Sequence, residues 1–144
     1  MALKRLERTQ ILIQGRRNLA EKMAGMILDQ YAVEVLEAAN SGLVMITVRE
    51  SAQNSLFYPG EVLVTECKVA IEGQIGLGIV QGLDSDLTYW LAVIDAAYRA
   101  NLPEVKMNEW KDALTAEKAW IADQRSEETG QILKTRANFE TMQV

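Results

Sequence analysis

The stretch GQIGLGIVQG at residues 73–82 decides the fold, because four of its ten residues are glycine. Gly76, Gly78 and Gly82 have a spacing close to that of a loop that binds the phosphates of a dinucleotide, but such a loop must open a helix. Here isoleucine and leucine alternate with the glycines, a period of two that is typical of a strand. The sequence therefore predicts a strand over 75–82, with both inner glycines on one face.

On that face, Gly76 and Gly78 would leave a strip of the strand without side chains, called here the glycine strip. Glycine inside a strand marks a bulge or the close approach of another backbone or a ligand. A closely packed helix or sheet needs no chemistry and is the favoured interpretation, and contact with a ligand is the alternative. Gly82 ends the strand, and Asp84 can cap the helix that follows. The candidate binding residues are Gly76, Gly78, Gly82 and Asp84.

The segments before this strand show the same alternation of apolar and polar residues. They predict three further strands, over residues 32–37, 43–50 and 61–71. The turn-rich ANSG lies between the first two, and Glu72 with Gly73 forms a two-residue turn before the last strand. We expect a single domain over residues 1–144 with an α+β fold, an antiparallel four-stranded meander flanked by N-terminal and C-terminal helices.

Four segments show helical spacing of apolar residues. The first helix ends at Gly15, a residue suited to a left-handed turn, and the second carries its apolar stripe between Leu19 and Ile27. The third spans 86–101 before Pro103 stops it. The chain after Met107 is also helical, with a fresh start predicted at Thr115.

Composition excludes several classes of function. The 144 residues carry a net charge of −5 with a pI near 4.8, so we expect no nucleic-acid partner. The absence of histidine removes the usual general base and metal ligand, and we expect no metal and no cofactor. A run of about 18 apolar residues is missing, so we expect no membrane contact and a cytoplasmic protein.

Few residues offer chemistry of their own. Asp84, Asp86 and Asp95 could serve as acids, bases or magnesium ligands, but the first two lie at a helix N-terminus, where carboxylates are favoured anyway. Cys67 lies on the apolar face of a strand and is interpreted as a small buried hydrophobe. No catalytic residue is assigned.

Two apolar segments are candidates for a partner interface. Phe57 and Tyr58 lie in an expected connection over 51–60, where they either tuck under the domain or meet a partner. Phe139 and Met142 lie near the chain end, where segments are ordered only if something holds them. In the isolated chain this tail would fold back or be borrowed by a second copy, so a homodimer is possible.

Four blocks of sequence resemble the PhnG family, a subunit of the bacterial carbon–phosphorus lyase core complex. They are EVLEAANSGLVMITVRES (34–51), FYPGEVLVTECKVAIEG (57–73), GQIGLGIVQGLDSD (73–86) with VIDAAYRAN (93–101), and TRANFETMQV (135–144). The run G-x-x-G-x-G-x-V-x-G-x-D, followed by an I-D-A helix and a C-terminal F-x-T-M, is specific as a set.

The resemblance implies an accessory subunit that works with three other core subunits, of the H, I and J types. In that family system, adenine is displaced from ATP by an alkylphosphonate, which gives α-D-ribose 1-phosphonate 5-triphosphate. A separate radical subunit later cleaves the carbon–phosphorus bond.

Two alternatives remain open. A stand-alone small-molecule-binding or sensory domain would have an enclosed pocket over Gly76 and Gly78. A small enzyme that uses Asp84 and Asp95 would turn over a substrate by itself.

Overall fold

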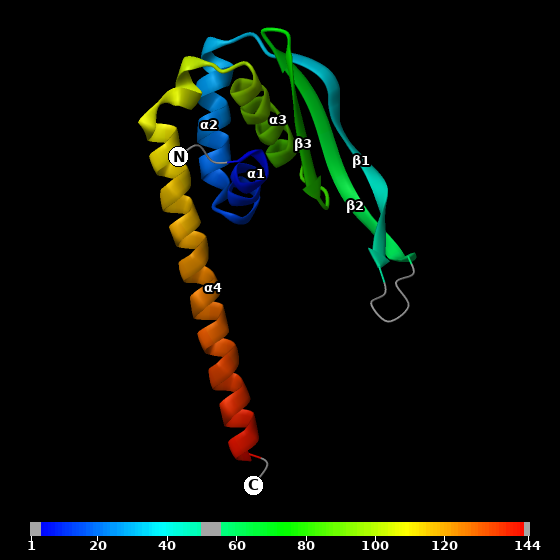
Figure 1. Cartoon of the computed structure of the whole chain (residues 1–144), viewed down its shortest axis with the longest axis vertical. Coiled ribbons are helices and arrows are strands. Elements are labelled where there is room, and N and C mark those ends of the chain that lie inside the picture. Colours follow the sequence, from blue (N-terminus) through cyan, green and yellow to red (C-terminus); the bar gives the residue numbers. More distant parts are fainter. Residues whose placement is uncertain (1–3, 50–55, 143–144) are drawn as a thin grey trace.

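The computed structural model describes the backbone of residues 4–49 and 56–142 and, within these ranges, the side chains of residues 4–45 and 60–130. Figure 1 shows a helical body that covers one face of a small sheet, a long helix that projects from the body, and a hairpin that projects on the other side. In chain order the elements are α1 (Arg5–Gln14), α2 (Arg17–Gln30), β1 (Glu34–Arg49), β2 (Leu56–Ile71), β3 (Gln74–Gln81), α3 (Ser85–Arg99), the short 3-10 helix η1 (Pro103–Lys106) and α4 (Asn108–Met142).

The sheet is antiparallel, as predicted, and has the strand order β1-β2-β3. The prediction of four strands was wrong, because the described chain forms three. The expected strands over 32–37 and 43–50 are one continuous strand of 16 residues. The expected connection over 51–60 is also too long, since β2 already begins at Leu56.

The residues read as a turn lie inside β1. Ser41 pairs with Thr65 and Gly42 with Val64, so the strand does not reverse there. Between Glu37 and Asn40 the register shifts, with one more residue on β1 than on β2, which is a β-bulge. The polar ANSG segment thus remains part of β1, with a bulge beside it. Pairing with the long strand β2 outweighs the local tendency of ANSG to form a turn.

The core lies between the sheet and the helices. α3 packs on β2 and β3, and α2 packs on α3. Cys67, Val69 and Ile71 of β2 are fully buried beneath α3. Trp110 at the start of α4 is also buried, and its indole nitrogen donates to the sulfur of Met26 at 3.4 Å.

Two helix details differ from the prediction. Gly15 has a φ of −80°, so it is not left-handed, and a Cβ there would lie 2.6 Å from Cγ of Glu117. Glycine is therefore needed for the approach of α4. α4 is continuous through Thr115, whose hydroxyl donates to the carbonyl of Lys111 one turn earlier instead of capping a new helix.

The hairpin of β1 and β2 extends past the end of β3. β3 pairs with β2 only from Val64 to Ile71. We call the remainder of the hairpin, residues 42–49 and 56–63, the β arm; it points away from the helical body (Figure 1). Among the described residues, no helix is long and apolar enough to cross a membrane.

Candidate functional site

The glycine strip of β3 lies directly under α3. A Cβ on Gly76 would lie 2.2 Å from the carbonyl oxygen of Ala92, and one on Gly78 would lie 2.1 Å from that of Thr88. The main chain of α3 thus fills the space over both glycines, as in the close-packing interpretation, and leaves no room there for a ligand. On the opposite face of the strand Ile75 and Ile79 are about half exposed.

Gly82 makes the junction between β3 and α3. Its φ of +88° lies in the left-handed region that favours glycine, and a Cβ there would meet nothing within 4 Å. The Thr65 hydroxyl donates to the Gly82 carbonyl at 2.6 Å, and the Gly82 amide donates to the carbonyl of Leu63. These bonds fix the direction in which the chain enters α3.

Asp84 is the N-cap of α3, as the sequence predicts. Its carboxylate accepts from the Leu87 amide at 3.2 Å and from the Arg17 guanidinium of α2. The hydrogen bond from Arg17 lowers the pKa of Asp84. This carboxylate therefore holds α2 against the start of α3.

Asp95 is the most heavily bonded carboxylate of the body. It is 4% exposed and accepts from Arg5 at 2.9 and 2.7 Å, from Arg8 at 3.0 Å, and from the Leu77 amide at 2.9 Å. These donors come from α1 and from β3, whereas Asp95 itself lies on α3. One side chain thereby joins three elements.

Arg8 is buried with this carboxylate. It is 5% exposed, and its guanidinium lies 3.8 Å from the centre of the Tyr98 ring, within cation–π range. Burial lowers the pKa of Arg8, and the charge of Asp95 opposes that effect. Burial also raises the pKa of Tyr98. The oxygens of Asp95 accept four hydrogen bonds, so this carboxylate holds α1, α3 and β3 together.

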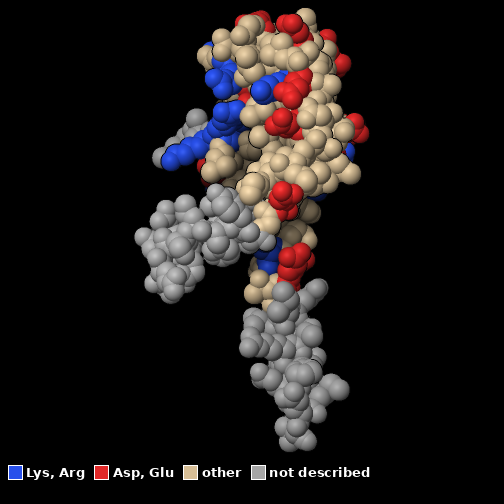
Figure 2. Space-filling model, turned by 90° about the vertical axis from the view of Figure 1, so that its right-hand side faces the viewer, with Lys and Arg blue, Asp and Glu red and all other residues tan. Residues whose placement is uncertain are grey.

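A second buried carboxylate joins α4 to the corner between α1 and α2. Glu117 accepts from the backbone amide of Arg16 at 3.0 Å and from its guanidinium at 2.9 Å. Burial alone would raise the pKa of Glu117, but these bonds outweigh it and the pKa is lowered. Figure 2 faces the right-hand side of Figure 1, where the sheet lies, and shows basic and acidic side chains next to one another on that surface.

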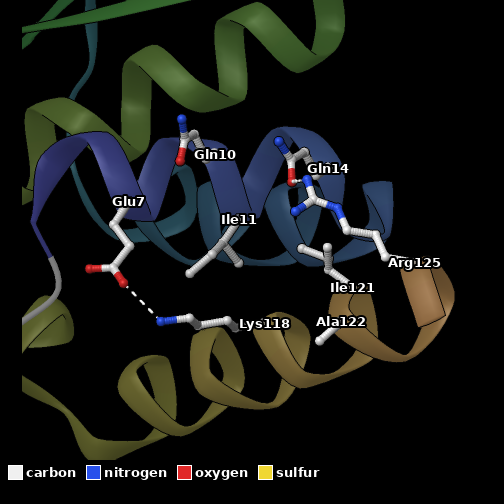
Figure 3. A pocket seen from close by; sticks show the side chains of 8 residues that line it. All are labelled: Glu7, Gln10, Ile11, Gln14, Lys118, Ile121, Ala122 and Arg125. Carbon is white, nitrogen blue, oxygen red and sulfur yellow. Dashed lines mark hydrogen bonds and ion pairs between the residues drawn. The ribbon is translucent and has the colours of Figure 1, made fainter. Parts of the chain in front are cut away.

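A groove of about 450 Å³ opens between α1 and α4 beyond this contact (Figure 3). Ile11 and Ile121 lie within it. Lys118 donates to Glu7 at 2.8 Å at one end, and Arg125 donates to Gln14 at 2.6 Å at the other. The groove therefore lies between two helices that are joined at both of its ends by polar side-chain contacts.

Cys67 is fully buried, and burial raises the pKa of its thiol. It pairs with Gly78 across the sheet and therefore lies under α3. Across the described side chains, no group of three or more carboxylates and thiols is placed to hold a metal ion.

The predicted partner residues fall outside the described side chains. The backbone places Phe57 and Tyr58 at the start of β2, in the β arm, and Phe139 and Met142 in the last turns of α4. The glycine strip and Asp84 lie together at α3, whereas these four lie on the projecting elements.

The sequence did not identify the arginines that bind Asp95. The basic N-terminal segment favours solvated helix faces, yet Arg8 precedes Ile11 and Leu12 by three and four residues and shares their buried face. The spacing of Arg8 from these two apolar residues was the sequence feature that could have predicted its burial. An aspartate on the apolar face of α3 required a cation from elsewhere in the chain.

Comparison with known families gives one match. A sequence model of the family described as phosphonate metabolism protein PhnG matches residues 3–143. No curated protein matches the chain significantly.

Proposed function

The chain belongs to the PhnG family of phosphonate metabolism proteins, and we propose that it is an accessory subunit of the bacterial carbon–phosphorus lyase core complex. In the cytoplasm it would join core subunits of the H, I and J types. There it would contribute to the displacement of adenine from ATP by an alkylphosphonate, which gives α-D-ribose 1-phosphonate 5-triphosphate. The observation that carries this proposal is the family match over nearly the whole chain.

Three carboxylates of the body form structural ion pairs, and this use supports an accessory role. Asp84 binds Arg17 of α2, Asp95 binds two arginines of α1, and Glu117 binds Arg16 at the corner between α1 and α2, so each carboxylate joins separate elements of the body. A rigid body held in this way can position other subunits. The alternative of a pocket over Gly76 and Gly78 has less support, because α3 fills that space.

The two projecting elements are the natural sites of subunit contact. We propose that Phe57 and Tyr58, at the start of β2, and Phe139 and Met142, in the last turns of α4, contact partner subunits. Both pairs lie at a distance from the body along the backbone (Figure 1).

Reconstitution tests the proposed function. The chain is co-expressed with the H, I and J subunits, and the mass of the purified assembly is measured. Adenine release from ATP and methylphosphonate is then followed in the presence of an ATP-binding-cassette protein, which the family's system also uses, with and without this chain. Release that depends on this chain supports the proposal, and full release without it contradicts the proposal.

Truncation tests the contribution of the tail. Deletion of residues 136–144 removes the last turns of α4, so the circular dichroism of the isolated chain should stay nearly unchanged while recovery with the partner subunits falls sharply. Equal recovery would move the contact to Phe57 and Tyr58. Unfolding of the truncated chain would show that the tail is part of the core.

A further inference from the structure

The part of the β arm whose side chains are described, residues 42–45 and 60–63, carries exposed apolar residues on both faces. Leu43, Met45 and Leu63 on the face toward α3 are 65%, 58% and 37% exposed, and Val44 on the other face is 50% exposed. Large apolar residues scattered singly are common on surfaces, but here they are gathered on one two-stranded element. An isolated two-stranded ribbon is marginally stable in water.

The position of α3 explains why nothing in the described body covers the arm. Thr88, near the start of α3, lies over Gly78, and Ala96, a little over two turns later, lies over Gly76. α3 therefore begins near the base of the arm and runs away from it. The same strand β2 is fully buried at Cys67 and Val69 but exposed at Leu63.

The outer edge of β1 lacks the usual protection against pairing. From Ala38 to Val48 the strand has no charged residue and no proline, the two features that commonly block the edge of a sheet. The register from Ser41 to Ile46 is regular. This segment offers unpaired backbone groups in the geometry that a further strand would match.

We propose that the β arm inserts into an apolar cleft of a different polypeptide, one of the core subunits of the proposed function, which covers both faces and pairs with the β1 edge. A second copy of this chain fits less well, because a strand added at the edge extends the sheet in its own plane and leaves both faces exposed. Glu61 is the one charged residue among the arm's described side chains, so the cleft places a cation opposite it.

The test uses two lysine substitutions on the arm, Leu43→Lys together with Val44→Lys. Both side chains point into solvent in the isolated chain, so the variant should fold as the parent does. The matched control is Ile75→Lys with Ile79→Lys, two half-exposed apolar residues of β3 outside the arm. Each chain is co-expressed with the H, I and J subunits and purified through a tag on a partner.

We expect recovery of the arm variant to fall at least tenfold and that of the β3 variant to stay within twofold of the parent. Backbone amides of residues 38–45 should exchange at least tenfold more slowly in the assembly than in the isolated chain. Equal recovery of the arm variant, or unchanged exchange, would overturn the arm proposal alone. Loss of recovery with the β3 variant only would place the contact on the open sheet face instead.

The inference rests on the proposed function, and the parent chain separates the two failures. If the parent does not co-purify with the core subunits, the proposed function fails and this inference fails with it. If the isolated parent is a dimer that the arm substitutions convert to a monomer, the occupant is a second copy and the proposal of a different polypeptide is wrong.

Discussion

The two halves of strand β2 both contain large apolar residues but have opposite surroundings. Cys67, Val69 and Ile71 are fully buried under α3, whereas Leu63 in the β arm is 37% exposed. Both halves carry large apolar residues, so hydrophobicity alone does not decide which half is covered. The covered half is the one beside Gly76 and Gly78, where the main chain of α3 can approach the sheet.

Glycine substitution separates the two halves most strongly. A single Cβ at Gly76 or Gly78 would overlap the α3 backbone, so Gly76→Ala or Gly78→Ala should lower the free energy of unfolding by about 3 kcal/mol or more. Gly42 in the arm has nothing within 4 Å of its Cβ position. Because glycine weakens a strand, Gly42→Ala should instead raise the free energy of unfolding, by up to about 0.5 kcal/mol.

Urea denaturation followed by circular dichroism measures all three variants. A fall in the free energy of unfolding at Gly76 or Gly78 together with a rise at Gly42 would confirm that backbone contact with α3 organises the body. A stable Gly76→Ala variant would show that α3 can shift outward. Valine at Gly76 or Gly78 should be worse than alanine, because its side chain is larger.

The second largest effect is expected at Asp95. Asp95→Asn removes the charge that two arginines share and leaves Arg8 buried without a counterion, which should cost about 3 kcal/mol of unfolding free energy. Asp86→Asn is the matched control, because its side chain is 79% exposed and its contact with Arg17 is long, at 3.9 Å. The control should change stability by less than about 0.5 kcal/mol.

Urea denaturation at pH 7 decides this prediction as well. If the two variants lose equal stability, the bonds at Asp95 contribute no more than a surface ion pair, and packing on the glycine strip alone joins α1, α3 and β3.

Much of the body could be predicted from local sequence. The period of two at the glycines, the turn at Glu72 and Gly73 and the Asp84 cap depend on neighbouring residues, and the structure confirms each of them. The failure at ANSG has a different cause. A turn signal states what a segment can do alone, and β1 stays extended because β2 supplies pairing partners on both sides of the bulge.

In the candidate site, too, local sequence did not reveal contacts with distant parts of the chain. Asp84 could be interpreted from its own helix start, but the roles of Arg8, Arg16 and Asp95 depend on ion-pair partners that lie 87 or more residues away in the chain. Gly15 was identified as a helix end for the wrong reason, since a Cβ there would meet Glu117 of α4 and the carbonyl oxygen of Ile11. Sequence spacing on one element does not reveal such contacts.

A smaller effect, with a pH dependence, is expected where α4 joins the body. The pKa of Glu117 lies below its ordinary value of 4.5 in the folded chain, so its stabilisation is present above that value and is lost as the pH falls through the folded-state pKa. Glu117→Gln should therefore cost about 2 kcal/mol at pH 7 and clearly less at pH 3. Urea denaturation at both values measures this, and a cost that is independent of pH would mean that packing and not charge holds α4.

The last comparison uses a thiol as a probe and gives the most direct view of the difference between body and arm. Cys67 is fully buried with a raised thiol pKa, so Ellman's reagent should label it at least 100-fold more slowly than in urea. In a Cys67→Ser chain that carries Val44→Cys, the thiol stands on the exposed arm and should react nearly as fast as in urea. The serine substitution alone should leave adenine release by the reconstituted complex unchanged, because the thiol lies under α3 and has no chemical role.

Addition of the core subunits then sharpens the comparison. The thiol at position 44 should become at least tenfold slower to label in the assembly, while the rate at Cys67 should change little because α3 already covers it. Fast labelling of Cys67 in the isolated chain would mean that α3 leaves the glycine strip often, and the contrast between a closed body and an open arm would be lost. Unchanged labelling at position 44 in the assembly would leave the arm in water and contradict its insertion into a partner.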